Sequence, residues 1–298
     1  MLLGMTNHVR DCLPPDRNPR RPRVALPKES IDTHVHVFEP GYPLSPGRGY
    51  NPPPSTLKDL ERLHATLGIE RVVFTQPSVY GTDNSAILDA MAALNAKTPD
   101  RARCVIAVDM EIKDDEIAAL DAAGVRGVRL NTDNKGGMPI RLGEIPELAA
   151  RIRAFGWHLE FLFPGKDILE LMPVFKTLKV PMSIAHFAYQ PATAGLNAPG
   201  FKALVELARQ GNTWIKISGA NRVSATDLPP YDDVKPMAEA LIAAAPGRIM
   251  WGTDWPHPNK YLVNPNDGDL VDAFGDWVSD EAMRRRIMVE TPAAFYRF

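Results

Sequence analysis

The chain has 298 residues, of which 45% are hydrophobic and 23% are charged, the proportions of a folded globular protein and not of a disordered one. Its formal net charge is -2, which gives no overall attraction to nucleic acid or to an anionic membrane, and no window of about 18 uninterrupted apolar residues predicts a membrane span. Cys12 and Cys104 are the only cysteines, which excludes a disulfide framework and a thiolate metal cluster and favours a reducing cytoplasm.

Residues 1–30 differ in composition from the rest of the chain. The stretch Pro14–Arg23 is basic and proline-rich, and proline fixes φ and removes a backbone donor, so this stretch predicts neither helix nor sheet. No apolar segment of a secretion signal is present. We expect an extended arm over 1–30, lying on the body or on a neighbouring subunit of a homo-oligomer, and one domain over 31–298. A second proline-rich stretch, Pro40–Pro54, predicts a long loop.

From residue 31 onward, apolar runs of strand length alternate with segments of helical period. The expected strands are Ile31–Val37, Arg71–Gln76, Cys104–Val108, Val125–Asn131, His158–Phe163, Met182–Phe187, Thr213–Ser218 and Ile249–Asp254. The expected helices are Thr56–Leu67, Ser85–Lys97, Glu116–Ala123, Glu144–Phe155, Asp167–Leu178, Phe201–Gln210 and Asp233–Ala245. Ser55 is expected to cap the first of these helices, and Gly124 and Gly156 stand at the ends of two others.

Short, nearly all-apolar strands separated by helices are typical of a parallel sheet buried on both faces. Eight strand–helix units favour an α/β fold of the closed (β/α)8 TIM-barrel type. The main rival is an open doubly wound sheet. The sequence lacks the glycine-rich dinucleotide turn, the GxxxxGK[ST] loop and the GxSxG elbow, so nothing in it calls for that rival.

Polar side chains gather where the predicted strands end, which in a barrel is the face that carries the active site. Alternation along the first strand places His34 and His36 on one face. His186 ends the sixth strand, and Asp254 and His257 follow the eighth. Four of the seven histidines therefore lie at one predicted rim, and imidazole near neutral pH acts as a ligand, a base or an electrophile. For His8, His64 and His158 we expect structural roles.

Two segments carry a resemblance to a known family. Ile31–His36 reads Ile-Asp-Thr-His-Val-His, and Trp251–Pro258 reads Trp-Gly-Thr-Asp-Trp-Pro-His-Pro. Together with Gln76–Asn84 and Gly127–Asn131, these segments resemble the amidohydrolase superfamily, in the branch of 2-pyrone-4,6-dicarboxylate lactonases and related lactone hydrolases. The similarity runs from about residue 30 to the C-terminus.

The resemblance implies a barrel hydrolase and assigns roles to matching residues. Asp254 would be the general base that activates water, while His34, His36 and His186 would bind that water and polarise the lactone carbonyl. The implied substrate-binding residues are Arg129, Arg222, Ser78, Tyr50, His257 and Asn131. The chemistry agrees, because lactone hydrolysis needs a base beside the attacking water and positive groups where the oxyanion develops. A guanidinium fork also matches the geometry of a carboxylate.

Three positions depart from the pattern of this family. Tyr189 stands where the pyrone dicarboxylate enzymes have a cation, Ala185 replaces a common aspartate, and Leu162 replaces a fifth-strand tyrosine. These changes remove polar contacts from the expected pocket. The missing cation would then come from Lys135 or Lys260.

The need for a metal is open at the level of sequence. A two-metal centre is disfavoured, because Arg129 on the fourth strand would repel the cations. One zinc held by His34, His36, His186 and Asp254 has an acceptable ligand set. The resemblance to pyrone lactonases points instead to catalysis without a metal, which we slightly prefer, with Arg129 and a protonated histidine supplying the positive charge.

We therefore expect a cytoplasmic lactonase that opens a small anionic lactone of the pyrone dicarboxylate or sulfomuconolactone type in the breakdown of aromatic compounds. The alternatives are a sugar-acid lactone isomerase and a zinc-dependent decarboxylase of the same superfamily. A non-enzymatic anion-binding barrel is a third alternative, but pure binding has no use for a general base. We expect neither nucleic acid nor a membrane as a partner.

Overall fold

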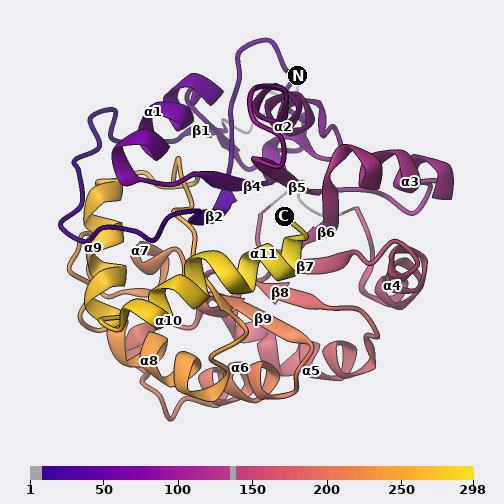
Figure 1. Cartoon of the computed structure of the whole chain (residues 1–298). Coiled ribbons are helices and arrows are strands. Elements are labelled where there is room, and N and C mark those ends of the chain that lie inside the picture. Colours follow the sequence, from indigo (N-terminus) through magenta and orange to yellow (C-terminus); the bar gives the residue numbers. More distant parts are fainter. Residues whose placement is uncertain (1–8, 135–138) are drawn as a thin grey trace, which may run out of the picture.

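The computed structural model describes residues 9–134 and 139–298 and shows a ring of parallel strands surrounded by helices (Figure 1). The eight-stranded sheet has the order β10-β9-β8-β7-β6-β5-β4-β2, and its registered pairs are all parallel. The strands are β2 (Ile31–Val35), β4 (Arg71–Thr75), β5 (Ala102–Ile106), β6 (Val125–Asn131), β7 (His158–Leu162), β8 (Met182–Ile184), β9 (Thr213–Lys216) and β10 (Ile249–Met250). The predicted (β/α)8 barrel is thus confirmed.

The seam between β2 and β10 is closed by isolated hydrogen bonds. Thr33 N donates to Trp251 O at 3.3 Å, and Asp254 N donates to His34 O at 2.9 Å. The buried carboxylate of Asp32 adds two hydrogen bonds across the seam, because it accepts from the backbone N–H and from the hydroxyl of Thr253 at 2.9 and 2.6 Å. This seam fixes Asp254 beside the histidines of β2.

Helices lie between consecutive strands and cover the outside of the barrel. They are α1 (Leu57–Leu67), α2 (Ser85–Lys97), α3 (Asp114–Ala123), α4 (Ile145–Arg153), α5 (Ile168–Thr177), α6 (Pro199–Arg209), α7 (Ala220–Val223) and α8 (Lys235–Ala244). The predicted cap of the first helix was wrong: Thr56, not Ser55, forms a capping box with Asp59. Gly124 ends α3 in the left-handed conformation, as expected of a glycine there.

Every predicted strand except Val125–Asn131 was too long at its carboxyl end, and three of these ends lead into the site. The first ends at Val35, the sixth at Ile184 and the eighth at Met250. The sixth ends early because His186 begins a left-handed turn, and Asp254 likewise has a positive φ of 63°. The polar ends of these strands therefore leave the sheet to form the site.

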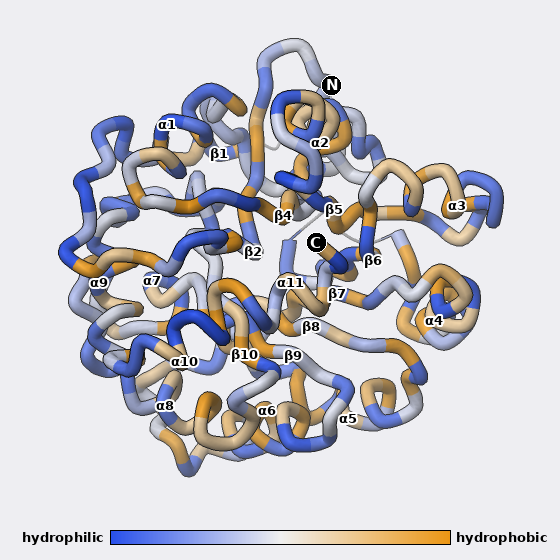
Figure 2. The backbone as a smooth tube through the Cα atoms, viewed as in Figure 1, coloured by the Kyte–Doolittle hydropathy of each residue, from blue (hydrophilic) through white to orange (hydrophobic). Residues whose placement is uncertain are grey.

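The last part of the chain consists of α9 (Asp267–Trp277), α10 (Glu281–Arg285), a π-helical turn (Arg286–Glu290) and α11 (Thr291–Tyr296). In Figure 1, α11 crosses the open end of the ring of strands. Its Tyr296 packs on an apolar cluster of Ile31, Val73, Val105 and Met250 from inside the barrel. Orange segments of the tube in Figure 2 mark the apolar strands around this end.

The arm contacts the body of its own chain. The short strand β1 (Arg10–Asp11) pairs in parallel with β3 (Tyr50–Asn51), which lies within the predicted loop. Further along, Arg20 and Arg23 form ion pairs with Asp272 of α9. Within the described part of the chain, no helix is long and apolar enough to span a membrane.

Candidate active site

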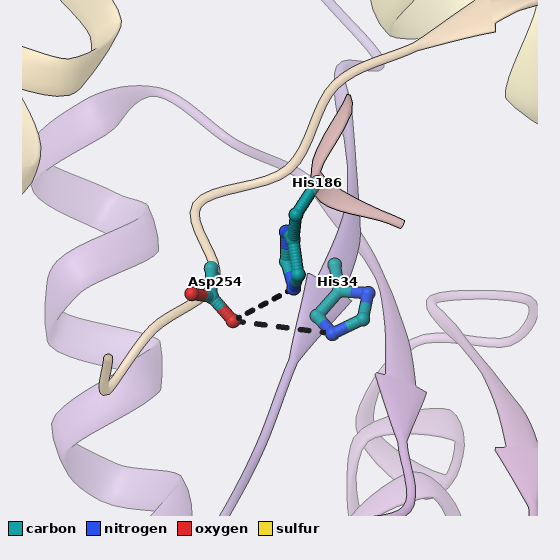
Figure 3. A group of neighbouring side chains, drawn as sticks. All are labelled: His34, His186 and Asp254. Carbon is teal, nitrogen blue, oxygen red and sulfur yellow. Dashed lines mark ion pairs between the residues drawn. The ribbon is translucent and has the colours of Figure 1, made fainter. Parts of the chain in front are cut away.

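Four side chains converge at the carboxyl ends of three strands. His34 and His36 come from β2 and its extension, His186 follows β8, and Asp254 follows β10. Asp254 Oδ1 lies 3.4 Å from His186 Nε2, 3.7 Å from His36 Nε2 and 3.9 Å from His34 Nε2. Figure 3 shows the carboxylate facing His186 and His34. The predicted catalytic set is therefore brought together around one oxygen.

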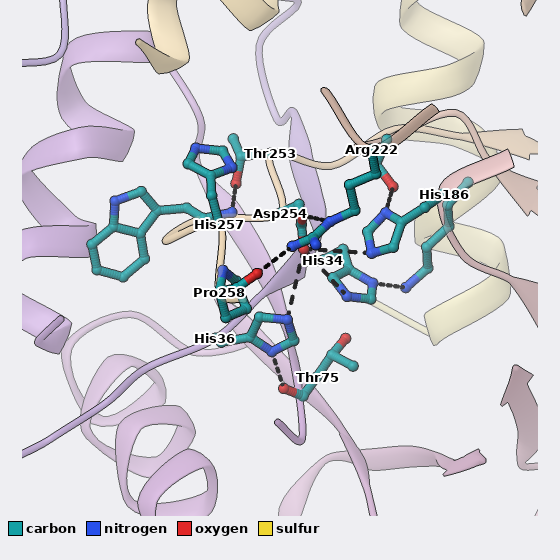
Figure 4. A network of polar contacts seen from close by, with 12 residues as sticks. His34, His36, Thr75, His186, Arg222, Thr253, Asp254, His257 and Pro258 are labelled. Carbon is teal, nitrogen blue, oxygen red and sulfur yellow. Dashed lines mark hydrogen bonds and ion pairs between the residues drawn. The ribbon is translucent and has the colours of Figure 1, made fainter. Parts of the chain in front are cut away.

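The other ring nitrogens have partners that fix the orientation of each imidazole (Figure 4). His36 Nδ1 lies 2.7 Å from the carbonyl oxygen of Thr75, so this nitrogen carries the proton and Nε2 keeps a lone pair. His186 Nδ1 lies 2.9 Å from the hydroxyl of Ser218. These contacts aim the Nε2 atoms at the carboxylate.

A buried ion pair lies beneath His34. Lys216 Nζ bonds to Glu160 and donates to Thr33 O at 2.6 Å, and it lies 3.3 Å from His34 Nδ1. Glu160 Oε1 is 3.5 Å from the same ring nitrogen. The Lys216–Glu160 ion pair therefore contacts His34 Nδ1 and fixes the ring without adding net charge.

A left-handed turn carries His186 to the site. The residues from His186 to Tyr189 all have φ between 50° and 53°, a backbone that costs about 1–2 kcal/mol per non-glycine residue. The turn packs against two glycines, because a Cβ at Gly165 would lie 2.2 Å from Tyr189 O and one at Gly219 2.8 Å from His186 Nδ1. The turn also lays the Tyr189 ring parallel to His186, with 5.8 Å between ring centroids.

The pKa values differ in consequence between Asp254, which is ionised, and the three imidazoles, which are neutral. Burial raises the pKa of Asp254, but the neighbouring Arg222 guanidinium and the imidazoles outweigh it and hold this pKa well below its usual value. Arg222 Nε donates to Asp254 Oδ2 at 2.6 Å. Burial lowers the pKa of His34 and of His36, and it lowers the pKa of His186 to about 3. The expected protonated histidine is therefore wrong at neutral pH: desolvation keeps these imidazoles uncharged.

A small, partly open cavity of about 20 Å³ lies above these groups; this is room for about one water molecule and far below the usual volume of a ligand pocket. Its lining includes the predicted residues His36, Tyr50, Ser78, Arg129, Asn131, His186, Arg222 and Asp254. Leu162 and Tyr189, two of the three departures noted in the sequence, line it too. Arg129 is fixed by donating to Gln76 O at 2.7 Å. The cavity thus holds two guanidinium groups beside the carboxylate.

Other predicted residues lie away from the cavity. His257 is fully buried and its Nε2 lies 3.1 Å from Asp267 Oδ1 of α9, so the structure does not place it among the lining residues. Lys260 donates to Asn221 O at 3.2 Å and is also outside the lining. Lys135 and His8 lie outside the described residues.

Sequence reasoning missed three lining residues: Asn134, Pro258 and Asn259. Asn259 Nδ2 donates to Asn134 Oδ1 at 3.0 Å, which joins the loops after β6 and β10. Their position just beyond predicted strand ends was the available signal, because loops at this face of a barrel build the site.

His34, His186 and Asp254 also fit one divalent metal ion. Their ligand atoms all lie within 4.8 Å of one another. His34 Nε2 and Asp254 Oδ1 are buried and have no hydrogen-bond partner among the described residues, as ligand atoms awaiting an ion would. Two imidazoles and a carboxylate suit zinc. His36 does not belong to this group, so the four-residue ligand set expected from the sequence is not reproduced.

Comparisons with known proteins agree with this architecture. The family model described as Amidohydrolase matches residues 31–298. A 4-sulfomuconolactone hydrolase from Hydrogenophaga intermedia is 34% identical, covering 96% of this chain and 94% of that protein. A 2-pyrone-4,6-dicarboxylate hydrolase from Comamonas testosteroni is also 34% identical, covering 94% and 93%. An apo crystal structure from Agrobacterium tumefaciens has a TM-score of 0.83 at 32% identity, covering 93% of this chain and 98% of that one. The chain is therefore a member of the amidohydrolase family.

Proposed function

We propose that this protein is a lactonase, a carboxylic-ester hydrolase that opens a small anionic lactone in the catabolism of aromatic compounds. The observation that carries the proposal is the environment of Asp254. One carboxylate oxygen faces three uncharged imidazoles while the other is held by Arg222. Relatives named as hydrolases of 4-sulfomuconolactone and 2-pyrone-4,6-dicarboxylate, each 34% identical, support the substrate class.

The chemistry follows from these contacts. A water molecule beside Asp254 Oδ1 loses its proton to this oxygen as the water oxygen bonds to the lactone carbonyl carbon. The lone pair on His36 Nε2 accepts a hydrogen bond from the same water and orients it. The ring C–O bond then breaks, the proton passes from Asp254 to the leaving oxygen, and the product is a ring-opened acid.

Charge is stabilised by the arginines, since the imidazoles are neutral. Arg129 lies on the cavity and is buried, with its Nε lacking a partner among the described residues. A buried guanidinium with a free donor is suited to an anionic oxygen, because charge-assisted bonds are strong away from water. We assign Arg129 to the substrate anion and Arg222 to Asp254 and the developing oxyanion.

A metal, where bound, would be held by His34, His186 and Asp254, and it would polarise the carbonyl and acidify the attacking water. We propose that turnover does not depend on it. Two permanent cations already face the cavity, and one of them occupies the second oxygen of Asp254. Dialysis against a chelator should leave kcat within about twofold; stoichiometric zinc whose removal abolishes turnover would overturn this part.

The test of the function is acid release at constant pH with 2-pyrone-4,6-dicarboxylate beside 4-sulfomuconolactone. Opening of either lactone releases one proton as the new carboxylic acid ionises, and we expect rapid release from at least one. Failure on both substrates, with and without added zinc, would contradict the proposal. Carbon dioxide release from an aromatic acid would instead support the decarboxylase alternative.

A lactone isomerase is the second candidate, because a D-galactarolactone isomerase from Agrobacterium fabrum is 32% identical over 93% of this chain. An isomerase converts one lactone into another without net addition of water. Mass spectrometry of the product in H₂¹⁸O separates the two, because only hydrolysis adds the label and the mass of water.

Assembly into a homo-oligomer through the arm stays a proposal. Deleting residues 1–28 and measuring the mass in solution by light scattering tests it. A mass per particle that does not change on deletion would remove the arm from any interface.

A further inference from the structure

The arm reaches the rim of the barrel beside the cavity. Residues 9–14, named here the N-terminal strap, run between two loops that each contribute to the cavity wall. One loop contains β3 with Tyr50, and the other follows β10 and contains Pro258 and Asn259.

The strap is tied to the β3 loop by backbone and side-chain bonds. Arg10 and Asp11 pair in register with Tyr50 and Asn51, and Cys12 N donates to Asn51 O at 2.8 Å. Asn51 Nδ2 also donates to Val9 O at 2.9 Å. The strap therefore holds the Tyr50–Asn51 segment along one edge of its backbone.

The strap holds the loop after β10 just as closely. The Asn259 N–H donates to Cys12 Sγ at 3.2 Å, and Leu13 N donates to Lys260 O at 3.0 Å. The Arg10 guanidinium lies 4.0 Å from the ring centroid of Tyr261. Tyr261 in turn donates its hydroxyl to Asn259 Oδ1 at 2.5 Å.

No hydrogen bond directly joins residues 50–51 to residues 258–264 in the part of the chain that the structure describes. The strap therefore supplies the hydrogen bonds between these two loops, beside the apolar cluster in which Tyr261 packs near Cys12 and Tyr50. Asn259 has a φ of 62°, a left-handed conformation that asparagine adopts more readily than most residues. The Cys12 sulfur accepts the N–H of that same residue, so the strap holds this turn in place.

We infer that the N-terminal strap is a positioning element for substrate: it holds Tyr50 and Asn259 against the cavity and so sets affinity, and hence specificity, for the part of the lactone away from the reacting carbonyl. The inference rests on the proposed function. The strap does not touch Asp254 or the imidazoles, so it governs KM and leaves kcat largely unchanged.

The test compares Cys12→Val, which removes the sulfur acceptor, with Cys12→Ser, which keeps an acceptor. Hydrogen–deuterium exchange needs no substrate and reports whether the strap holds the two loops in place. In Cys12→Val, peptides covering 256–264 should exchange at least about fivefold faster because the bond from Asn259 N–H is lost, while 50–51, held by retained backbone bonds, and β4 to β7 are unchanged. Cys12→Ser should restore slow exchange.

Kinetics report the catalytic part. KM for the preferred lactone should rise about five- to tenfold in Cys12→Val with kcat within twofold, and Cys12→Ser should return to within about twofold of wild type. Arg23→Met is the matched control, because Arg23 belongs to the same arm but binds Asp272 of α9. This control should change neither KM nor exchange at the cavity.

The outcomes separate the two proposals. Unchanged exchange in Cys12→Val overturns the strap whatever the substrate. Faster exchange with an unchanged KM overturns its role in binding. A wild-type protein that opens no lactone overturns the proposed function, and the exchange data then still decide whether the strap holds the cavity wall.

Discussion

At the carboxyl ends of the strands, buried polar atoms of His34 and Asp254 have no partner among the described residues, and non-glycine residues adopt left-handed backbone. At the amino ends, Tyr296 of α11 packs on Ile31 and the apolar interior of the barrel. Buried polar atoms without a partner occur at both ends, since the Tyr296 hydroxyl and His158 Nε2 also lack one among the described residues. The ends differ in their chemistry: ionisable groups gather around Asp254 at the carboxyl end, whereas apolar packing covers the amino end. The amino end, which α11 covers and which is called here the closed end, can therefore contribute stability that the carboxyl (catalytic) end lacks.

The largest expected effect is a loss of kcat from a substitution at the catalytic end. Asp254→Asn keeps the shape of the side chain but removes the base, so kcat should fall by about 10²- to 10⁴-fold. The melting temperature should fall as well, because the substitution leaves the buried Arg222 guanidinium without its charged partner, so kcat is measured at a temperature where the variant is folded. Near-normal turnover would show that the base is assigned wrongly.

Asp267→Asn is the matched control for Asp254→Asn. Asp267 is also a fully buried carboxylate, but it contacts His257 outside the cavity. We expect the control to change stability and not kcat.

The closed end should respond in the opposite way. Tyr296→Ala leaves a cavity under the barrel and should lower the free energy of unfolding by about 3–5 kcal/mol. The folded fraction should keep its kcat. Denaturant unfolding with activity measured at low temperature checks both.

Tyr296→Phe sharpens this test. The buried Tyr296 hydroxyl lacks a hydrogen-bond partner within the described residues, so its removal should be neutral or stabilising. A large loss of stability in this variant would mean that the hydroxyl has a partner, such as an ordered water.

A smaller effect separates binding from chemistry within the catalytic end. Arg129→Met keeps a long apolar stem but removes the cation, so KM for a dianionic lactone should rise about 10- to 100-fold. Steady-state kinetics with a neutral lactone provide the comparison, because its KM should change much less. An unchanged KM for the dianion would remove Arg129 from the binding residues.

The smallest effect, per pH unit, is shared by both ends. Burial lowers the pKa of His186 at the catalytic end and of His158 at the closed end to about 3. Between pH 6.5, the ordinary histidine value, and about 3, the unfolded chain binds protons that the folded chain does not. The free energy of unfolding should therefore fall as the pH falls, by about 1.4 kcal/mol per unit for each such histidine.

His158→Gln tests the share of the closed end. In chelator-treated protein, the slope of unfolding free energy against pH should become shallower in this variant by about the contribution of one histidine. An unchanged slope would show that His158 is protonated in the folded protein.

Parts of the site that follow from periodicity were predictable. Alternation alone placed His34 and His36 on one face, and the closing strand brought Asp254 beside them. The turn at His186–Tyr189 was not predictable, because no glycine within it signals a left-handed backbone; the glycines that accommodate it, Gly165 and Gly219, lie elsewhere in the sequence.

The arm shows a second limit. Proline content predicts an extended stretch but carries no information about what that stretch contacts. The pairing of Arg10–Asp11 with Tyr50–Asn51 depends on the position of a loop, which only the folded barrel defines. Long-range contacts of irregular segments were therefore out of reach.

The handedness of the turn at His186–Tyr189 bears on how this family member can acquire new preferences. Residue 189 faces the cavity, yet its φ of 50° favours asparagine, aspartate, histidine and glycine and penalises β-branched side chains. The backbone conformation therefore limits which substitutions residue 189 tolerates, whatever ligand the cavity binds. Asparagine, aspartate or histidine can replace Tyr189 without a change in the backbone. Valine or isoleucine there would first require the whole turn to unwind.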